Sequence, residues 1–200
     1  SVSYAQVLEV GDTIPSGLGA PVCANVDPLY MPNDSLYLDY YQGWRVTWIM
    51  FFTSWCPFCQ DEAPLTQEVY EALQDSGLIV IGAGADWGQP DSCSEWVENY
   101  GITYPMLDGT DYAGTSWEDF GVSAIPHNVI IGADGVVKYS VAGYNENSVL
   151  EAVMNALEEC GDACGCSDIL GDLDGTYNSE GDPLINIMDL IKLADMVSLG

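Results

Sequence analysis

The feature that most constrains this chain is a pair of cysteines, Cys56 and Cys59, where a buried strand runs into a helix. The apolar, aromatic and β-branched residues 46–52 predict the strand, and residues 57–74 predict the helix, which Gly77 ends. At the first turn of a helix, unpaired N–H groups and the positive end of the macrodipole stabilise a thiolate. A thiolate is the species that attacks a disulfide. We therefore expect Cys56 to attack a partner disulfide and Cys59 to close onto Cys56 and release the partner.

The rest of the chain predicts a mixed sheet flanked by helices. A helical crossover between strands implies parallel pairing, whereas the turn at Asp134-Gly135 implies an antiparallel hairpin at one end. Residues 1–34, rich in Pro, Gly and Asn, are expected to form an extended N-terminal segment. The further elements expected are strands at 36–41, 78–81, 128–131 and 136–141, and helices at 91–100, 117–120 and 145–159.

The charge balance excludes one class of partner. The chain has 31 Asp and Glu against 3 Lys and Arg, for a formal net charge of −28. Binding to a phosphate backbone needs Lys and Arg, so we expect no nucleic acid partner. No apolar run reaches the roughly 18 residues of a spanning helix, so we expect no membrane insertion. The acidity indicates either solubility in a salty or calcium-rich setting or a basic partner.

The cysteine count indicates an oxidising compartment. Seven cysteines are present, and this number favours an extracytoplasmic location, in the periplasm, at the cell surface or secreted. The five outside the Cys56–Cys59 pair allow two structural bridges and leave one thiol over. The expected bridges are a local one, Cys160 with Cys164 or Cys166, and a long-range one, Cys23 with Cys93.

Several further sequence motifs accompany the two cysteines. They are Trp55-Cys56-x-x-Cys59 followed by Glu62 and Pro64, Gly121-Val122-x-x-Ile125-Pro126 before a strand, and the Asp134-Gly135 hairpin. With these motifs, residues 35–159 resemble the TlpA/ResA branch of thioredoxin-like proteins, which are extracytoplasmic disulfide reductases. The resemblance implies an α/β fold, a thioredoxin-like three-layer sandwich with a mixed central sheet. It also implies protein disulfide or dithiol substrates, an upstream thiol electron donor and no cofactor for catalysis.

The same resemblance assigns a substrate edge. It implies that the Ile125–Pro126 bond is cis and faces the cysteine pair. Such a turn exposes the backbone of residue 125, to which an extended substrate segment can pair. Trp55, Pro57 and Phe58 are expected to shape the docking surface, with core packing as the alternative role for Trp55.

The proton acceptor has to differ from that of thioredoxin, which has a buried Asp where this chain has Met50. Asp86, in the loop after the next strand, is the first candidate to take the proton of Cys59, and Glu62 is the second. The alternatives are a solvated loop acid for Asp86 and a charge complementing the helix dipole for Glu62. His127, the one histidine, is expected to tune the thiolate or donate to substrate, or else to be an ordinary strand-edge residue.

A second, smaller unit follows. Residues 171–193 resemble one calcium-loop-helix segment of a dockerin, a motif whose alternating oxygen ligands suit Ca²⁺. The resemblance implies a cohesin-like partner, and the alternative is an acidic, loosely ordered tail. Carried over, the ligands are Asp172 and Asp174 at loop positions 1 and 3, Asn178, Glu180 or Asp182 in the middle, and Asn186 and Asp189 at positions 9 and 12.

The sequence therefore predicts three parts and one leading function. Residues 1–160 form the thioredoxin-like domain, 161–167 a Cys/Gly linker, and 168–200 the small calcium-loop-helix unit. The leading function is an extracytoplasmic thiol–disulfide oxidoreductase, with protein disulfide reductase favoured over oxidase and isomerase, between which the sequence does not decide. The alternative is a docking protein, in which the thioredoxin-like domain is cargo and the C-terminal unit binds its partner.

Overall fold

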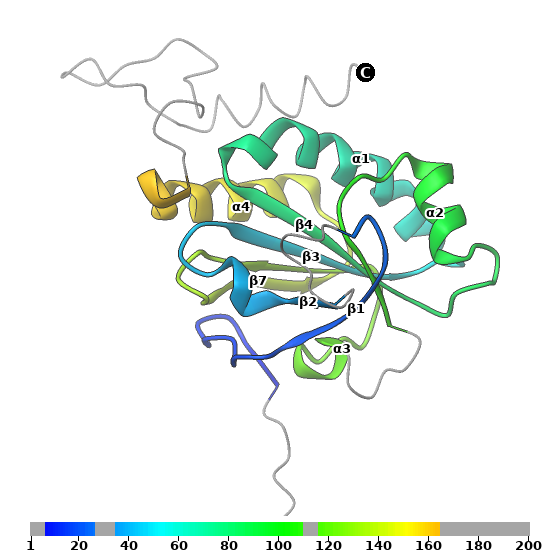
Figure 1. Cartoon of the computed structure of the whole chain (residues 1–200), viewed down its shortest axis with the longest axis horizontal. Helices are drawn as coiled ribbons and strands as arrows, with labels where there is room; N and C mark the ends of the chain where they lie inside the picture. Colours follow the sequence, from blue (N-terminus) through cyan, green and yellow to red (C-terminus); the bar gives the residue numbers. More distant parts are fainter. Residues whose placement is uncertain (1–6, 27–34, 110–115, 165–200) are drawn as a thin grey trace, which may run out of the picture.

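The computed structural model describes residues 7–26, 35–109 and 116–164 (Figure 1). The strands are β1 (Gly19–Ala24), β2 (Ser35–Tyr37), β3 (Val46–Thr53), β4 (Leu78–Ala85), β5 (Met106–Asp108), β6 (His127–Ile131) and β7 (Val137–Ala142). The helices are α1 (Pro57–Leu73), α2 (Cys93–Tyr100), α3 (Ser116–Asp119) and α4 (Glu146–Cys160). All seven strands join one sheet in the order β2-β1-β5-β4-β3-β6-β7. Helices α1, α2 and α4 lie over one face of the sheet and α3 lies on the other (Figure 1).

Strand β3 lies inside the sheet, between β4 and β6, and is buried along its whole length. It pairs in parallel with β4 and antiparallel with β6, so the predicted mixed α/β sheet is confirmed. Because both faces are covered, β3 is apolar almost throughout instead of alternating. Trp48, Met50 and Phe52 pack in the core under α1 and α4, whereas Ile49 and Phe51 pack in the core on the opposite face.

Elements with strong local signals form where the sequence predicts them. Helix α2 begins with a capping box between Ser92 and Glu95 and ends at Gly101, whose φ of +64° suits glycine. The hairpin between β6 and β7 is antiparallel, and Gly135 in its turn has a φ of +78°. Residues 74–76 form a 3₁₀ turn that finishes α1 before Gly77.

The edge of the sheet differs from the prediction. Strands β1 and β5 were not expected, and the strand expected at 36–41 is divided between β2 and a 3₁₀ turn at Leu38–Tyr41. β1 pairs with β2 and β5, both of which are three residues long. Strands this short show too little periodicity to be recognised, because they form only through pairing with distant segments.

Two structural disulfides hold this domain together, and both predicted pairings are confirmed. Cys23 is bonded to Cys93, which ties β1 to α2, with 6.2 Å between the Cα atoms. Cys160 is bonded to Cys164, which fixes the end of α4. Cys164 is thus the local partner of Cys160, and Cys166 lies outside the described residues.

The predicted linker beyond Cys164 and the calcium-loop unit at 168–200 also lie outside the described residues. The division into three parts and the calcium ligands therefore stay predictions from the sequence. Among the helices of the described segments, none has the length and apolar character needed to cross a membrane.

Candidate redox site

The two cysteines lie at the junction of β3 and α1 and form a disulfide, with 5.2 Å between their Cα atoms. Cys56 is the N-cap of α1 and Pro57 occupies the first turn, where a missing N–H costs nothing. The backbone N–H of Cys59 donates to the Cys56 sulfur at 3.3 Å. The helix N-terminus therefore points a donor at the sulfur expected to carry negative charge after reduction.

Two aromatic side chains flank the cysteines at the surface. Trp55 is 53% exposed and Phe58 is 72% exposed, although both are large and apolar. The indole N–H of Trp55 donates to the Asp86 carboxylate at 3.2 Å. Trp55 therefore does not pack in the core, and the two rings are available to a docking partner.

A groove runs from Phe58, which lies between the two cysteines in the sequence, to the loop before β6. The Ile125–Pro126 bond in this loop is cis, as the family resemblance implied. The Pro126 carbonyl accepts a hydrogen bond from the Gly143 N–H at 2.6 Å, whereas the Ile125 backbone makes no hydrogen bond to another described residue. The groove has a volume of about 360 Å³, and its lining consists of Phe58, Asp61, Glu62, Leu65, Ile125, Pro126, Gly143 and Tyr144.

Glu62 is a buried acid at the base of this groove. Its side chain is 1% exposed, and neither carboxylate oxygen has a hydrogen-bond partner among the described residues. Burial raises the pKa of Glu62 to about 8, and the neighbouring Asn128 amide partly offsets the rise. Burial raises the pKa values of Tyr104 and Tyr144, and the charge of Glu62 adds to the rise. At neutral pH this carboxyl can therefore both hold and release a proton.

Asp86 has a different environment. It is exposed, its backbone φ is +55°, and it accepts the hydrogen bond from Trp55. Asp86 therefore anchors the Trp55 ring from the loop after β4. The geometry favours Glu62 over Asp86 as the proton acceptor, which reverses the order expected from the sequence.

His127 faces away from the cysteine pair. Its ring lies edge-on to Phe51 on the sheet face opposite α1, with 6.1 Å between the ring centroids. Its Nε2 atom shares a hydrogen bond with the Ser140 hydroxyl at 2.9 Å. Burial lowers the pKa of His127, so the ring is neutral at pH 7. The position matches that of a strand residue better than that of a group that tunes the thiolate.

Asn128, a fully buried amide next to the groove, is a site residue that was not predicted from the sequence. Its Oδ1 accepts from the Trp48 indole at 2.7 Å, and its Nδ2 donates to the Gly143 carbonyl at 3.3 Å. These bonds hold the loop at Gly143 in place, and the backbone N–H of Gly143 in turn donates to the Pro126 carbonyl. The signal available in the sequence was an asparagine at the start of the otherwise apolar strand predicted at 128–131. A polar side chain buried in such a strand must be hydrogen-bonded, and this requirement marks it for attention.

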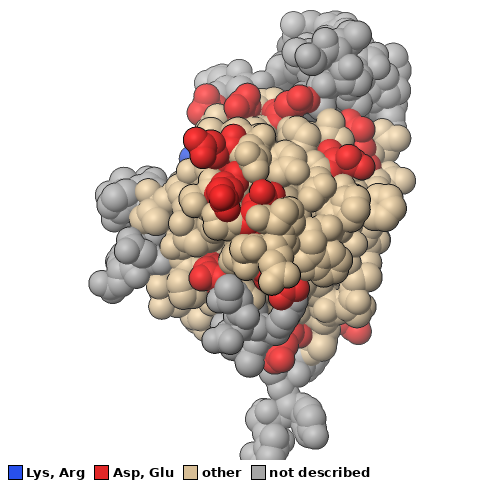
Figure 2. Space-filling view, turned by 90° about the vertical axis from the view of Figure 1, so that its right-hand side faces the viewer, with Lys and Arg blue, Asp and Glu red and all other residues tan. Residues whose placement is uncertain are grey.

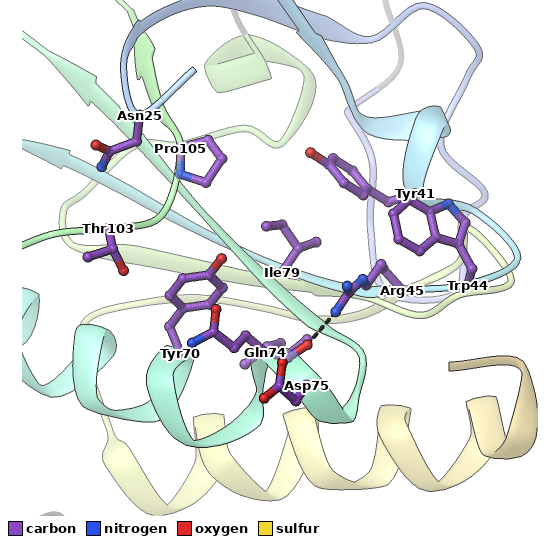
Figure 3. Close-up of a pocket in the computed structure, with 11 residues that line it drawn as sticks. Asn25, Tyr41, Trp44, Arg45, Tyr70, Gln74, Asp75, Ile79, Thr103 and Pro105 are labelled. Atoms are coloured by element: carbon purple, nitrogen blue, oxygen red, sulfur yellow. Dashed lines mark hydrogen bonds between the residues drawn. The ribbon is translucent and has the colours of Figure 1, made fainter. Parts of the chain in front are cut away.

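A second pocket of about 220 Å³ lies at the opposite end of β3, about 23 Å away along the strand (Figure 3). Arg45 in this pocket donates to the Gln74 carbonyl and lies over the Trp44 ring, 5.0 Å from its centroid. An arginine bonded to the last carbonyls of a helix caps it. Stabilising the end of α1 accounts for Arg45, and the pocket does not reach the cysteines.

Known proteins resemble this chain over the part that carries the site. Thiol:disulfide interchange protein CycY of Rhizobium leguminosarum bv. viciae is 32% identical over 116 residues, covering 58% of this chain and 60% of CycY. Thiol-disulfide oxidoreductase ResA of Bacillus thuringiensis is 27% identical over 110 residues, covering 54% of this chain and 60% of ResA. The chain thus spans about 60% of each of these relatives.

Solved structures share the fold. A putative thiol:disulfide interchange protein DsbE from Chlorobium tepidum matches with a TM-score of 0.61 at 19% identity, covering 75% of this chain and 99% of the other. A secreted disulfide oxidoreductase of Mycobacterium tuberculosis matches with a TM-score of 0.53 at 21% identity, covering 69% of this chain and 95% of the other. The thioredoxin-like fold is therefore confirmed.

The strongest assignment comes from a family model. The model described as the AhpC/TSA family matches residues 32–140, more than half of the chain, and this segment contains both redox cysteines and the cis-proline loop. The expected resemblance to ResA holds at this broader level, and the chain belongs to the AhpC/TSA family.

Proposed function

We propose that this protein is a thiol–disulfide oxidoreductase that exchanges disulfides with protein substrates through Cys56 and Cys59, and that it works as a reductase. The observation that carries the proposal is the Cys59 N–H donating to the Cys56 sulfur at the start of α1, beside an open groove. The names of the relatives CycY and ResA support the same reaction.

The reaction has two exchange steps. In the reduced protein, the Cys56 thiolate attacks one sulfur of the substrate disulfide, whose S–S bond breaks as a Cys56–substrate disulfide forms. The second substrate sulfur leaves as a thiolate and takes up a proton. Cys59 then loses its proton and attacks the Cys56 sulfur, which forms the Cys56–Cys59 disulfide and releases the first substrate sulfur.

The balance of the reaction requires an electron donor. The substrate gains two electrons and two protons, and the protein is left as the disulfide. An upstream dithiol must reduce Cys56–Cys59 before the next turnover. Glu62 receives the proton of Cys59 in the second step, because it is the buried acid of the groove and its pKa of about 8 suits transfer near neutral pH.

We place this activity outside the cytoplasm. The disulfides Cys23–Cys93 and Cys160–Cys164 are structural, and such bonds persist in oxidising compartments. One structurally similar protein is described as secreted.

Insulin reduction tests the proposal. With dithiothreitol as the donor, the wild-type protein should accelerate reduction of the insulin disulfides, and Cys56→Ser should abolish the acceleration. Cys23→Ser/Cys93→Ser serves as a control, because it removes a disulfide outside the groove. Wild-type protein that leaves the rate at the level of dithiothreitol alone would refute the proposed activity.

For residues 168–200 we propose calcium binding and, through it, docking to a cohesin-like partner. The support is the sequence motif with Asp172, Asp174, Asn186 and Asp189 as ligands. Calcium titration of the whole protein tests it: wild type should bind Ca²⁺ and Asp172→Ala should bind it at least about tenfold more weakly. Equal affinities would remove the site.

A further inference from the structure

The end of the molecule that carries the redox pair is negatively charged. Figure 1 shows β3 and α1 meeting on its right-hand side, and Figure 2 shows that side facing the viewer, with acidic residues spread over it and basic colour only at its edge. This distribution follows from the composition.

Acidic side chains adjoin the groove on both sides. Asp61 lines it, and Tyr144, which also lines it, has a pKa raised by burial and by the charges of Glu62, Glu146 and Glu68. On the other side, Asp86 holds the Trp55 indole. The acids beside the groove and the cysteine pair, called the rim acids below, are Asp61, Glu68, Asp86 and Glu146.

No described basic residue neutralises this rim. Within the described segments the basic residues are Arg45 and Lys138. Arg45 lies at the opposite end of β3, bonded to the Gln74 carbonyl. Lys138 is held by Asp134 at 2.9 Å and by Glu159 at 2.6 Å. A cation that approaches the cysteines therefore meets these acids without competition from the basic residues of the described segments.

The interior of the groove is apolar, in contrast to its rim. Phe58, Leu65, Ile125 and Pro126 supply most of the walls, and Phe58 is largely exposed. The one ionisable group at the base is Glu62, which is buried and has both oxygens unpartnered among the described residues. An apolar side chain next to a reacting cysteine fits the walls, and positively charged neighbours fit the rim.

We infer that the substrates are cationic protein disulfides, in which a bulky apolar residue adjoins the reacting cysteine and Lys or Arg lies within a few residues of it. The inference rests on the proposed function, since it concerns the same cysteine pair. Charges of opposite sign raise the rate of encounter, by roughly 10-fold to 1,000-fold in charged clefts. The extended substrate would pair with the free backbone of Ile125 while its cations meet the rim acids.

The test uses three disulfide-linked peptides with the same cysteine and the same phenylalanine neighbour. Their flanking residues are Lys, Gln or Glu. Stopped-flow Trp fluorescence on the reduced protein gives the second-order rate constant of each peptide at about 20 mM and about 500 mM NaCl, where charges are respectively little and strongly screened. The Lys peptide should react at least about tenfold faster than the Glu peptide at low salt, and the gap should fall below about threefold at high salt.

Two double variants test whether the acids beside the groove cause the preference for the Lys peptide. Asp61→Asn/Glu146→Gln should reduce the preference for the Lys peptide at low salt by about threefold or more. Glu9→Gln/Asp75→Asn removes the same number of acids away from the groove and should keep the wild-type preference.

The outcomes separate the two proposals. Equal, salt-insensitive rates for the three peptides would overturn the inferred substrate class and leave the exchange activity standing. Absence of exchange with every peptide would overturn the proposed function and this inference with it. A preference that both double variants reduce equally would also overturn it, because net charge rather than the rim would then be responsible.

Discussion

Glu62→Gln should remove a pH-dependent cost from the folded protein. The glutamine keeps nearly the same shape but cannot ionise, so the exchange isolates the carboxyl charge. In the wild type, burial raises the pKa of Glu62 from 4.5 to about 8. The folded state therefore keeps a proton that the unfolded chain releases between these pH values.

The sign and size of the effect follow from this difference in bound protons. Below pH 4.5 both states are protonated, and the carboxyl imposes no cost. As the pH rises, the unfolded state binds fewer protons than the folded state, so the free energy of unfolding falls by about 1.4 kcal/mol per pH unit. The cost is about 3 kcal/mol at pH 7 and levels off near 5 kcal/mol above about pH 8.

Guanidinium unfolding of the oxidised proteins between pH 4.5 and 8.5 measures this cost. The difference between Glu62→Gln and wild type should be smallest at the acid end and rise by about 3 kcal/mol by pH 7 in favour of the variant. Asp75→Asn, which removes an exposed acid at the far end of α1, should follow the wild-type curve. A difference that stays constant within about 1 kcal/mol across the range would refute the buried, protonated Glu62.

Three further outcomes follow from other contacts. Asn128→Leu should lower the free energy of unfolding by about 1–3 kcal/mol, because the buried Trp48 indole N–H loses its acceptor; a denaturation midpoint equal to that of the wild type would contradict this. Cys23→Ser/Cys93→Ser should cost about 4 kcal/mol, because the bond closes a loop with a sequence separation of 70; a loss under about 1 kcal/mol in calorimetry would contradict that entropic account. Phe58→Ala should change stability by less than about 0.5 kcal/mol, because its ring is 72% exposed, yet should slow exchange with a peptide that has an apolar neighbour. Unchanged exchange in that assay would remove Phe58 from the docking surface.

Local chemistry explains why much of the fold was predictable. The junction of β3 and α1, the Ser92 capping box and the hairpin at Gly135 each depend on residues within one or two turns of chain. Strands β1 and β5 depend on pairing with remote segments, and their own sequences show no strand pattern. Strands that form only by pairing with distant segments were therefore the part of the sheet that the sequence did not reveal.

The candidate site was likewise predictable from the sequence only in part. The motif located Cys56, Cys59 and Pro126, because the spacing itself is part of the chemistry. The ranking of Glu62 and Asp86 depended on burial, which arises where α1 packs against the sheet and the Pro126 loop. Burial of this kind is set by tertiary packing. The positions of the two acids in the sequence do not show which of them is buried.

The central claim is that Cys56 attacks a protein disulfide and that Cys59 resolves the product. The most direct test treats reduced Cys59→Ser protein with the disulfide-linked Lys peptide and locates the adduct by mass spectrometry of tryptic and chymotryptic fragments. We expect a stable mixed disulfide at Cys56, no adduct at that position in wild type after the reaction ends, and none in Cys56→Ser. A Cys59→Ser protein that forms no mixed disulfide at Cys56, or a Cys56→Ser protein that forms as much adduct as Cys59→Ser, would contradict the account.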